Sequence, residues 1–154
     1  MTASLRTGAV LFVQDLARVA VYYEKVAGLR KMHTAADHIV LKAGSYELVV
    51  HAIPEALAGA TFIESPLSIR EDCTVKLVFF IDSISSARKL TARWGGILNG
   101  PDREWEYGGT VVCDGCDPEG NVVQFRQRIG ANKRLKQRPL LKRAASKKRR
   151  HAKK

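Results

Sequence analysis

Near the start of the chain, the period of the apolar positions changes within twenty residues. Residues 9–13 are all apolar, which is typical of a β-strand that is covered on both faces. Between Leu16 and Ala27 the apolar residues recur at steps of three and four, which indicates a helix with one buried stripe. Asp15 suits the N-cap of this helix, and Gly28 suits its end. We therefore predict that the chain opens with a strand followed by a helix.

Three shorter segments with strand character follow the helix. They lie at about residues 30–33, 38–42 and 46–52, and turn-forming residues separate them. Pro54 ends the last of them, and the charged, proline-containing stretch that follows is typical of a connection. The first part of the chain is therefore predicted to contain one strand, one helix and then three strands.

The same order of elements then begins again. Residues 75–81 have strand character, and a helix is predicted from about residue 84 to residue 94, before Gly95. Placing residue 8 over residue 76, an ungapped offset of 68, aligns residues of the same kind: Val10 with Val78, Phe12 with Phe80, and Gly28 with Gly96. Three more strands are expected after this helix. The sequence therefore indicates an internal duplication of one structural unit.

Two segments resemble hallmarks of a known superfamily. One is the opening strand and helix, with Tyr22-Tyr23, and the other is the turn at residues 117–121, Asp-Pro-Glu-Gly-Asn, which leads into the last strand. Together with the duplication, they make residues 8–128 resemble the vicinal-oxygen-chelate superfamily of glyoxalases, bleomycin-resistance proteins and dioxygenases. The resemblance implies an α+β fold of paired βαβββ modules. Their mixed sheet forms a cup that binds the ligand, usually within a homodimer.

The resemblance also implies a division of the chain. We expect residues 1–129 to form the domain, with its first module at about residues 5–56, a linker at about 57–73 and its second module at about 74–128. Residues 130–154 are expected to form a basic, disordered tail.

This tail accounts for the net charge of +11. It holds twelve Lys and Arg residues and no acid, so the other 129 residues carry 14 basic and 15 acidic side chains. Such a segment buries too little apolar surface to fold, and it would bind polyanions through counterion release. Non-specific nucleic acid is therefore a candidate partner of the tail. The densest basic run of the tail consists of Lys147, Lys148, Arg149 and Arg150. The alternative is a tail that only increases solubility.

The family's metal ligands are not carried over. In metal-dependent members, the resemblance implies His or Gln on the first strand of each module and Glu late in its last strand. These positions fall on Gly8, Lys76, about Leu48 and Gln124. Only Gln124 offers a neutral oxygen donor, whereas a divalent ion needs several ligands. We therefore expect no cofactor, and a metal held by Glu47, His51 and Gln124 is a disfavoured alternative.

A small-molecule pocket is the preferred interpretation of the positions that would face the cup. Side chains alternate faces along a strand. The family's metal-ligand positions therefore share the cup face with both apolar and polar residues of this chain. Such a mixture favours a pocket over a closed core, in which unpaired cations are costly. The aromatic segment at residues 103–107 either covers the cup or forms an ordinary edge strand. The predicted ligand-binding residues are Phe12, Lys76, Phe80, Trp105, Tyr107, Gln124 and Arg126.

The two parts of this pocket favour opposite ligand charges. Lys76 and Arg126 favour an anionic or carbonyl-bearing ligand, whereas Glu104 and Glu106, beside the aromatic residues, favour a cation. The sequence therefore leaves the ligand open.

Two further clusters have possible chemistry that we interpret as incidental. His33, His38 and His51 lie in the first module, but their positions on the predicted strands do not converge, so we expect structural or solvated histidines. The Cys113-x-x-Cys116 spacing resembles redox and zinc motifs. It lacks further ligands and does not begin a helix, so we expect two unrelated thiols.

Three function classes remain. The preferred one is a metal-free, small-molecule-binding protein of the bleomycin-resistance type. The alternatives are a metal-dependent lyase, isomerase or dioxygenase with atypical ligands, and an accessory protein tethered to RNA or DNA by its tail, so enzymatic activity is left undecided. Three cysteines and the absence of an apolar segment of about 20 residues favour a cytoplasmic protein without membrane contact.

Overall fold

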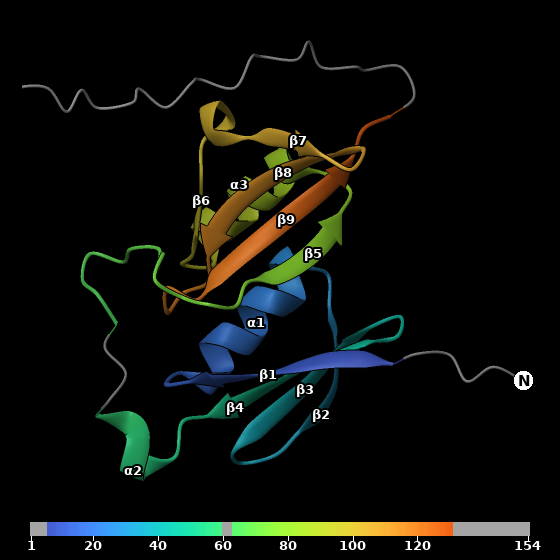
Figure 1. The fold of residues 1–154 in the computed structure, drawn as a ribbon. Helices are drawn as coiled ribbons and strands as arrows, with labels where there is room; N and C mark the ends of the chain where they lie inside the picture. Colours follow the sequence, from blue (N-terminus) through green and yellow to red (C-terminus); the bar gives the residue numbers. More distant parts are fainter. Residues whose placement is uncertain (1–5, 60–62, 131–154) are drawn as a thin grey trace, which may run out of the picture.

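The computed structural model describes residues 6–59 and 63–130. Its first unit contains β1 (Thr7–Val13), α1 (Leu16–Val26), β2 (Arg30–Thr34), β3 (His38–Ala43) and β4 (Tyr46–Ala52). The four strands form one sheet, which we call sheet A, in the order β1-β4-β3-β2, with β1 parallel to β4 (Figure 1). The predicted strand, helix and three strands are confirmed.

The second unit repeats this order with one additional strand. After the short helix α2 (Glu55–Ala58), the chain forms β5 (Leu77–Ile81), α3 (Ile84–Arg93) and β6 (Ile97–Leu98). It continues through the 3₁₀ turn η1 (Pro101–Arg103) to β7 (Trp105–Tyr107), β8 (Thr110–Cys116) and β9 (Val122–Arg128). These strands form sheet B in the order β5-β9-β8-β6, and β7 pairs with β8.

A glycine turn explains the additional strand. Gly108 and Gly109 join β7 to β8 and have φ values of 55° and 73°. Two consecutive positive φ angles are the requirement of the tight turn that matches the twist of a β-hairpin. The turn folds the aromatic segment back onto β8, as the edge-strand alternative predicts.

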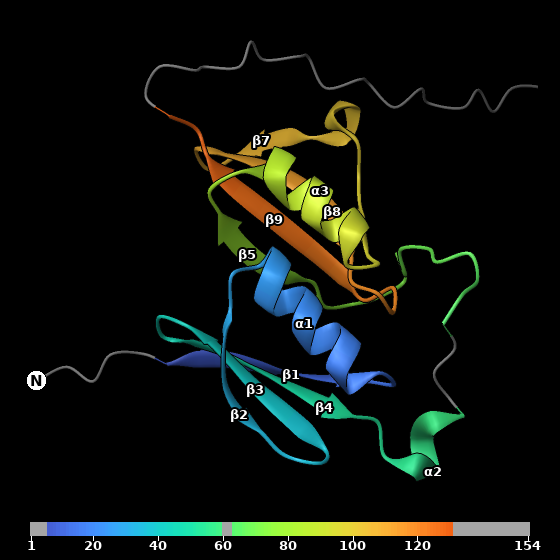
Figure 2. The ribbon, with the colours of Figure 1, turned by 180° about the vertical axis from the view of Figure 1, so that it is seen from behind.

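Each sheet packs a helix on one face and leaves its other face open. Figure 2 shows α1 in front of sheet A and α3 in front of sheet B. Val19, Tyr22 and Tyr23 of α1 are fully buried, together with Leu41 of β3 and Phe125 of β9. The helix-facing sides of both sheets therefore form one hydrophobic core. The far sides expose apolar residues, including Val10, Phe12 and Phe80.

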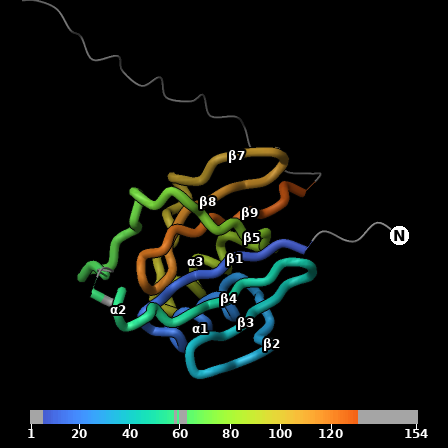
Figure 3. The backbone as a smooth tube through the Cα atoms, turned by 60° about the horizontal axis from the view of Figure 1, so that its bottom comes forward, coloured from blue at the N-terminus to red at the C-terminus, as the bar shows by residue number. Residues whose placement is uncertain are grey.

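The two units contact each other through their helices and through the rings of Tyr46 on β4 and Phe79 on β5, whose centroids lie 5.9 Å apart. α1 packs against α3, and in the described part of the chain no hydrogen-bonded ladder joins sheets A and B. The first strands, β1 and β5, are each the edge strand of their own sheet. Figure 3 shows the backbone turned so that its bottom comes forward, with β5 and β9 above β1 and β4 in the view.

The two segments that resemble superfamily hallmarks meet in space. The carboxylate of Glu119, which is buried, accepts hydrogen bonds from the backbone N–H of Gln14 at 2.9 Å and of Asp15 at 2.6 Å. The hydroxyl of Tyr23 donates to Asp117 Oδ2 at 3.1 Å. The turn between β8 and β9 therefore anchors the start of α1.

None of the helices in residues 6–59 and 63–130 has the length and apolar character that a membrane span requires. Apart from Gly130, the predicted basic tail lies outside the described residues, including its four-residue run at Lys147, Lys148, Arg149 and Arg150.

Candidate functional site

The open face of sheet B holds a continuous polar chain across three strands. Lys76 Nζ, just before β5, lies 2.5 Å from Asp114 Oδ2 on β8. Gln124 Nε2 on β9 donates to the other oxygen of Asp114 at 3.0 Å. Gln124 Oε1 in turn accepts from Arg126 Nε at 2.7 Å. One carboxylate and one amide therefore hold two cations in fixed positions on this face.

Aromatic rings flank the guanidinium at the end of this chain. The centre of the Arg126 guanidinium lies 5.9 Å from the centroid of the Phe80 ring and 5.2 Å from that of Tyr107. Arg126 is paired with Phe80 on β5 and with Val112 on β8, which is paired with Trp105. Directly opposed residues share a sheet face. Six of the seven predicted ligand-binding residues therefore lie on one face: Lys76, Phe80, Trp105, Tyr107, Gln124 and Arg126.

The position of the nearby acids removes the conflict over ligand charge. Glu104 forms an ion pair with Arg88 of α3, on the side of the helix. Glu106 lies between Trp105 and Tyr107 in the strand and is paired with Val111, so its side chain projects to the opposite face. The face that carries Arg126 is thus cationic and aromatic. A small cavity of about 190 Å³ lies beside it, lined by Phe80, Ile81, Asp82, Arg126 and Arg128.

Phe12 lies apart from these six residues, on the open face of sheet A. Its ring centroid is 5.3 Å from that of His51, which is its partner across the β1–β4 ladder. Within the described chain, the predicted set is therefore divided between two sheets.

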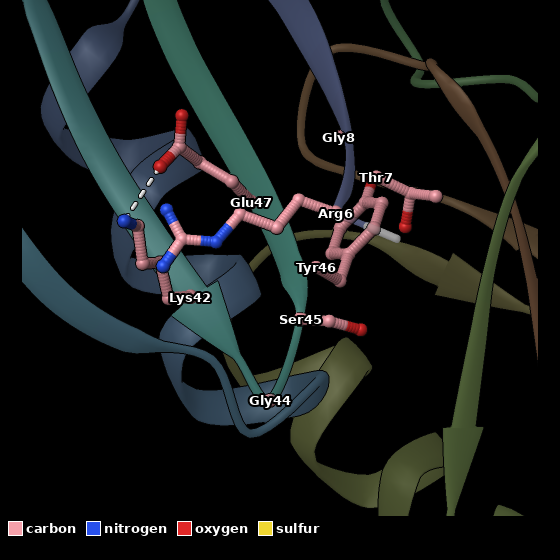
Figure 4. A pocket seen from close by; sticks show the side chains of 8 residues that line it. All are labelled: Arg6, Thr7, Gly8, Lys42, Gly44, Ser45, Tyr46 and Glu47. Atoms are coloured by element: carbon pink, nitrogen blue, oxygen red, sulfur yellow. Dashed lines mark ion pairs between the residues drawn. The ribbon is translucent and has the colours of Figure 1, made fainter. Parts of the chain in front are cut away.

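A larger cavity, of about 360 Å³, lies at the start of sheet A (Figure 4). The beginning of β1 and the turn between β3 and β4 line it with Arg6, Thr7, Gly8, Lys42, Gly44, Ser45, Tyr46 and Glu47. Lys42 Nζ and Glu47 Oε2 are paired at 2.8 Å, so these two charges satisfy each other. The paired charges of Lys42 and Glu47 make this cavity a weaker candidate for ligand binding than the open face of sheet B.

The family's metal positions do not fit a metal here. A Cβ atom at Gly8 would lie 2.6 Å from the backbone oxygen of Glu47, so no ligating side chain fits at that position. Lys76 is paired with Asp114, and the amide oxygen of Gln124 is already used by Arg126. The position placed at about Leu48 offers no ligand to the open face, because Leu48 is fully buried on the helix side of sheet A.

The disfavoured alternative set, Glu47, His51 and Gln124, is also not brought together. Gln124 is on sheet B, and Glu47 and His51 are four residues apart on β4. That spacing corresponds to about 13 Å along a strand.

The Cys-x-x-Cys segment has the geometry of two separate thiols. Cys113 and Cys116 are both free and buried, and they differ in parity on β8, so their side chains point to opposite faces. Burial raises the pKa of Cys113, and it raises the pKa of Cys116 to about 11. Neither thiol is activated as a nucleophile.

The expectation that the three histidines do not converge was wrong. His38 and His51 are directly opposed on β3 and β4, and the ring centroid of His33 lies 5.6 Å from that of His38. The sequence analysis also missed two acids: Asp37, which contacts His38, and Asp114, which organises the polar chain of sheet B. The register of strand pairing, which the periodicity alone does not give, was the missing information.

No protein-family profile and no curated protein sequence matches the chain. Solved structures with similar folds exist at low sequence identity. A glyoxalase/bleomycin resistance protein/dioxygenase family enzyme from Burkholderia phytofirmans PsJN superposes with a TM-score of 0.60 at 17% identity, over 79% of this chain and 97% of that one.

Two further proteins of similar structure are named for their relation to antibiotics. A bleomycin resistance determinant encoded on the transposon Tn5 gives a TM-score of 0.53 at 15% identity, over 81% of this chain and 98% of the other. TnmS3, an antibiotic binding protein from Streptomyces sp. CB03234, gives 0.55 at 15% identity, over 84% and 99%. These likenesses confirm the predicted fold class, that of the vicinal-oxygen-chelate proteins.

Proposed function

We propose that this protein binds a small organic ligand on the open face of sheet B, without using the metal positions of the fold family. The ligand class is an anionic or carbonyl-bearing molecule with a planar apolar part. The observation that carries the proposal is Arg126, a guanidinium held by Gln124 between two exposed aromatic rings.

The chemistry of this arrangement favours such a ligand. Gln124 fixes Nε of Arg126, and we find no hydrogen bond to its terminal nitrogens among the described residues. These nitrogens form the fork that binds carboxylate and similar oxygens in two parallel hydrogen bonds. Phe80 is 65% exposed and Tyr107 is 63% exposed, so both rings offer an apolar surface to a planar group.

The fixed geometry also lowers the cost of binding. The polar chain from Lys76 through Asp114 and Gln124 orients Arg126 before any ligand arrives. Ordering a flexible side chain at an interface costs about 0.5–1.5 kcal/mol, and this cost is already met in the free protein.

A binding screen with a matched pair of variants tests the proposal. Aromatic carboxylates, aromatic amines and neutral aromatic compounds are screened by thermal shift, and hits are measured by calorimetry with and without EDTA. We expect carboxylates or carbonyl compounds to bind, with affinity unchanged by EDTA. Arg126→Gln should weaken binding by about tenfold or more, since a hydrogen bond to a charged group is worth about 1.5–3 kcal/mol.

Arg93→Gln is the control, because Arg93 lies at the end of α3, away from the open face. It should leave the affinity of every hit unchanged. Equal affinity of the Arg126→Gln variant and the wild type would contradict the proposed site, and a preference for aromatic amines would contradict the proposed ligand charge.

We propose in addition that a homodimer completes the site. Both first strands are sheet edges with unpaired backbone groups, and their outward apolar residues, such as Phe12 and Phe80, are exposed. Edge strands and exposed apolar patches of this kind are where other chains pair. Sedimentation equilibrium should give about twice the monomer mass, and a charged substitution, Phe12→Glu, should shift the protein to monomers. A monomeric wild type would contradict this proposal.

The second candidate function is tethering to RNA or DNA by residues 130–154. The supporting observation is their charge, because twelve cations without one acid occupy this segment. Such a segment gives salt-dependent binding with little sequence preference.

A further inference from the structure

A cluster of histidines lies on the open face of sheet A, away from the proposed ligand face. His38 on β3 and His51 on β4 form a directly opposed pair. Their rings stack with centroids 5.9 Å apart and planes inclined by 14°. The third histidine of the module, His33 on β2, has its ring centroid 5.6 Å from that of His38. Three adjacent strands thus contribute imidazole groups to one place.

A carboxylate completes the cluster. Asp37 directly precedes β3, and its Oδ1 lies 2.8 Å from Nδ1 of His38. The other oxygen of Asp37 lies 3.7 Å from Nε2 of His51. One ligand atom from each of Asp37, His38 and His51 lies within 4.8 Å of the other two. The Asp37 side chain is 65% exposed and those of the histidines 31%, so an ion reaches the cluster from solvent.

The orientation of His51 suits a metal ligand. Its Nδ1 lies 2.7 Å from the backbone oxygen of Ala52. A carbonyl only accepts hydrogen bonds, so Nδ1 is the donor, and Nε2, which lies toward Asp37, is the ring nitrogen available to a metal ion. Metal-ligating histidines usually donate their second ring N–H to a carbonyl or carboxylate in this way, which fixes the tautomer and the ring.

We propose that Asp37, His38 and His51 bind a divalent first-row transition-metal ion, with Zn²⁺ as the representative case. Imidazole and carboxylate are suitable ligands for Zn²⁺. Bond lengths of about 2.0–2.2 Å hold tetrahedral ligand atoms about 3.4 Å apart, so small side-chain rotations close the present cluster around an ion. The three protein ligands leave a fourth position to water or to His33.

The proposed centre is separate from the metal positions implied by the fold family. Those positions fall on Gly8, Lys76, about Leu48 and Gln124, none of which belongs to the cluster. Phe12 is its neighbour through His51, so the centre would lie against an apolar wall of sheet A. The inference does not depend on the organic ligand proposed for sheet B.

Metal titration of the full chain tests the proposal without any organic ligand. Zn²⁺ binding is measured by calorimetry after chelator removal, and Co²⁺ is used in parallel because its visible absorption reports the ligand geometry. We expect one tight ion per chain. His38→Gln and His51→Gln should each weaken Zn²⁺ binding by about tenfold or more and reduce the Co²⁺ absorption.

Two controls make the result specific. His151→Gln removes the one histidine of the sequence that lies outside the first module and should leave the affinity unchanged. Glu47→Gln, on the same strand as His51 but paired with Lys42, should also leave it unchanged. Circular dichroism of each variant verifies the fold. Unchanged Zn²⁺ affinity in folded His51→Gln protein, or loss of binding in His151→Gln, would overturn the proposal. Arg126→Gln should bind Zn²⁺ normally, which separates this test from that of the proposed function.

Discussion

Solvent access differs sharply among the three thiols, and their reactivity should follow it. Cys73 is exposed, whereas Cys113 and Cys116 are buried, with the pKa of Cys116 raised to about 11. The thiolate is the reactive form. We expect one thiol per chain to react quickly with Ellman's reagent at pH 8, and all three to react in guanidinium chloride. Rapid labelling of Cys116 in native protein, located by mass spectrometry, would contradict the buried geometry.

Asp117 should make stability depend on pH in a defined direction. Burial raises the pKa of its carboxyl group, while hydrogen bonds from Asn121, Glu119 and Tyr23 oppose the shift. The folded state therefore holds this proton more tightly than the unfolded state. The stability that the group contributes is complete below its unfolded pKa of about 3.9 and is lost as pH rises through the folded value.

The Asp117→Asn variant tests this direction of the pH dependence, because the substitution removes the titration of the Asp117 carboxyl group. We expect the free energy of unfolding of wild type minus that of the variant to be larger at pH 4.5 than at pH 7.5. Urea unfolding of both proteins at each pH measures this difference. A difference that grows with pH would mean that the carboxylate is favoured in the folded state.

Some of the candidate site was predictable residue by residue, and some was not. Strand alternation was sufficient to place Lys76, Gln124 and Arg126 on one face, because β9 has no irregularity. The pairing of His38 with His51 escaped prediction because it depends on the register between β3 and β4, which apolar periodicity does not give. His33 escaped prediction because the pairing register of β2 and β3 shifts between Lys31 and His33. Such a bulge moves the following side chains to the other face, and no feature of the periodicity reveals it.

At the scale of elements, the start of α1 depends on a turn far along the chain. Glu119 accepts two backbone N–H groups at the beginning of the helix, where hydrogen-bond donors lack partners within the helix. Glu119→Gln removes the charge and turns an amide N–H₂ toward those donors. We expect a loss of about 1–3 kcal/mol in the free energy of unfolding, as for other buried, charge-assisted hydrogen bonds.

Glu106→Gln is the matched control for this measurement. Glu106 lies on the exposed strand β7, so its substitution should change the free energy of unfolding by less than about 0.5 kcal/mol. Urea unfolding at pH 7 compares both variants with the wild type. Equal effects of the two substitutions would show that Glu119 does not stabilise the helix start.

The elements themselves were largely predictable, with β7 decided only by the structure. Apolar periods and caps were sufficient for α1 and α3, whose N-caps Asp15 and Ser83 accept from the backbone as expected of such residues. The segment at residues 103–107 remained open between a cover and an edge strand. Its charges alternate with aromatics, and only the Gly108-Gly109 turn determines that it pairs with β8.

At the scale of the whole molecule, the basic segment should act independently of the domain. A chain that ends at Gly130 keeps every described strand and helix and loses all twelve cations of the basic segment. We expect it to keep its unfolding temperature and to lose binding to heparin and RNA. In the full chain this binding should fall steeply between 50 and 200 mM salt. RNA binding that survives truncation would place the polyanion site on the domain.

The duplication predicted the fold, but not how its two copies are arranged. An offset of 68 residues matches β1 with β5 and α1 with α3. The offset does not indicate whether strands or helices form the contact between the two copies. In the structure, α1 packs against α3, and Tyr46 of β4 contacts Phe79 of β5.

The anchor between Glu119 and the start of α1 has a consequence for the order of synthesis. The two partners are separated by 105 positions, so the helix start of the first copy lacks its anchor until the last turn of the second copy has been translated. Contacts of such high sequence separation form late and slow folding. We expect a nascent chain stalled before residue 117 to be digested by protease within residues 6–59, and the released chain to resist.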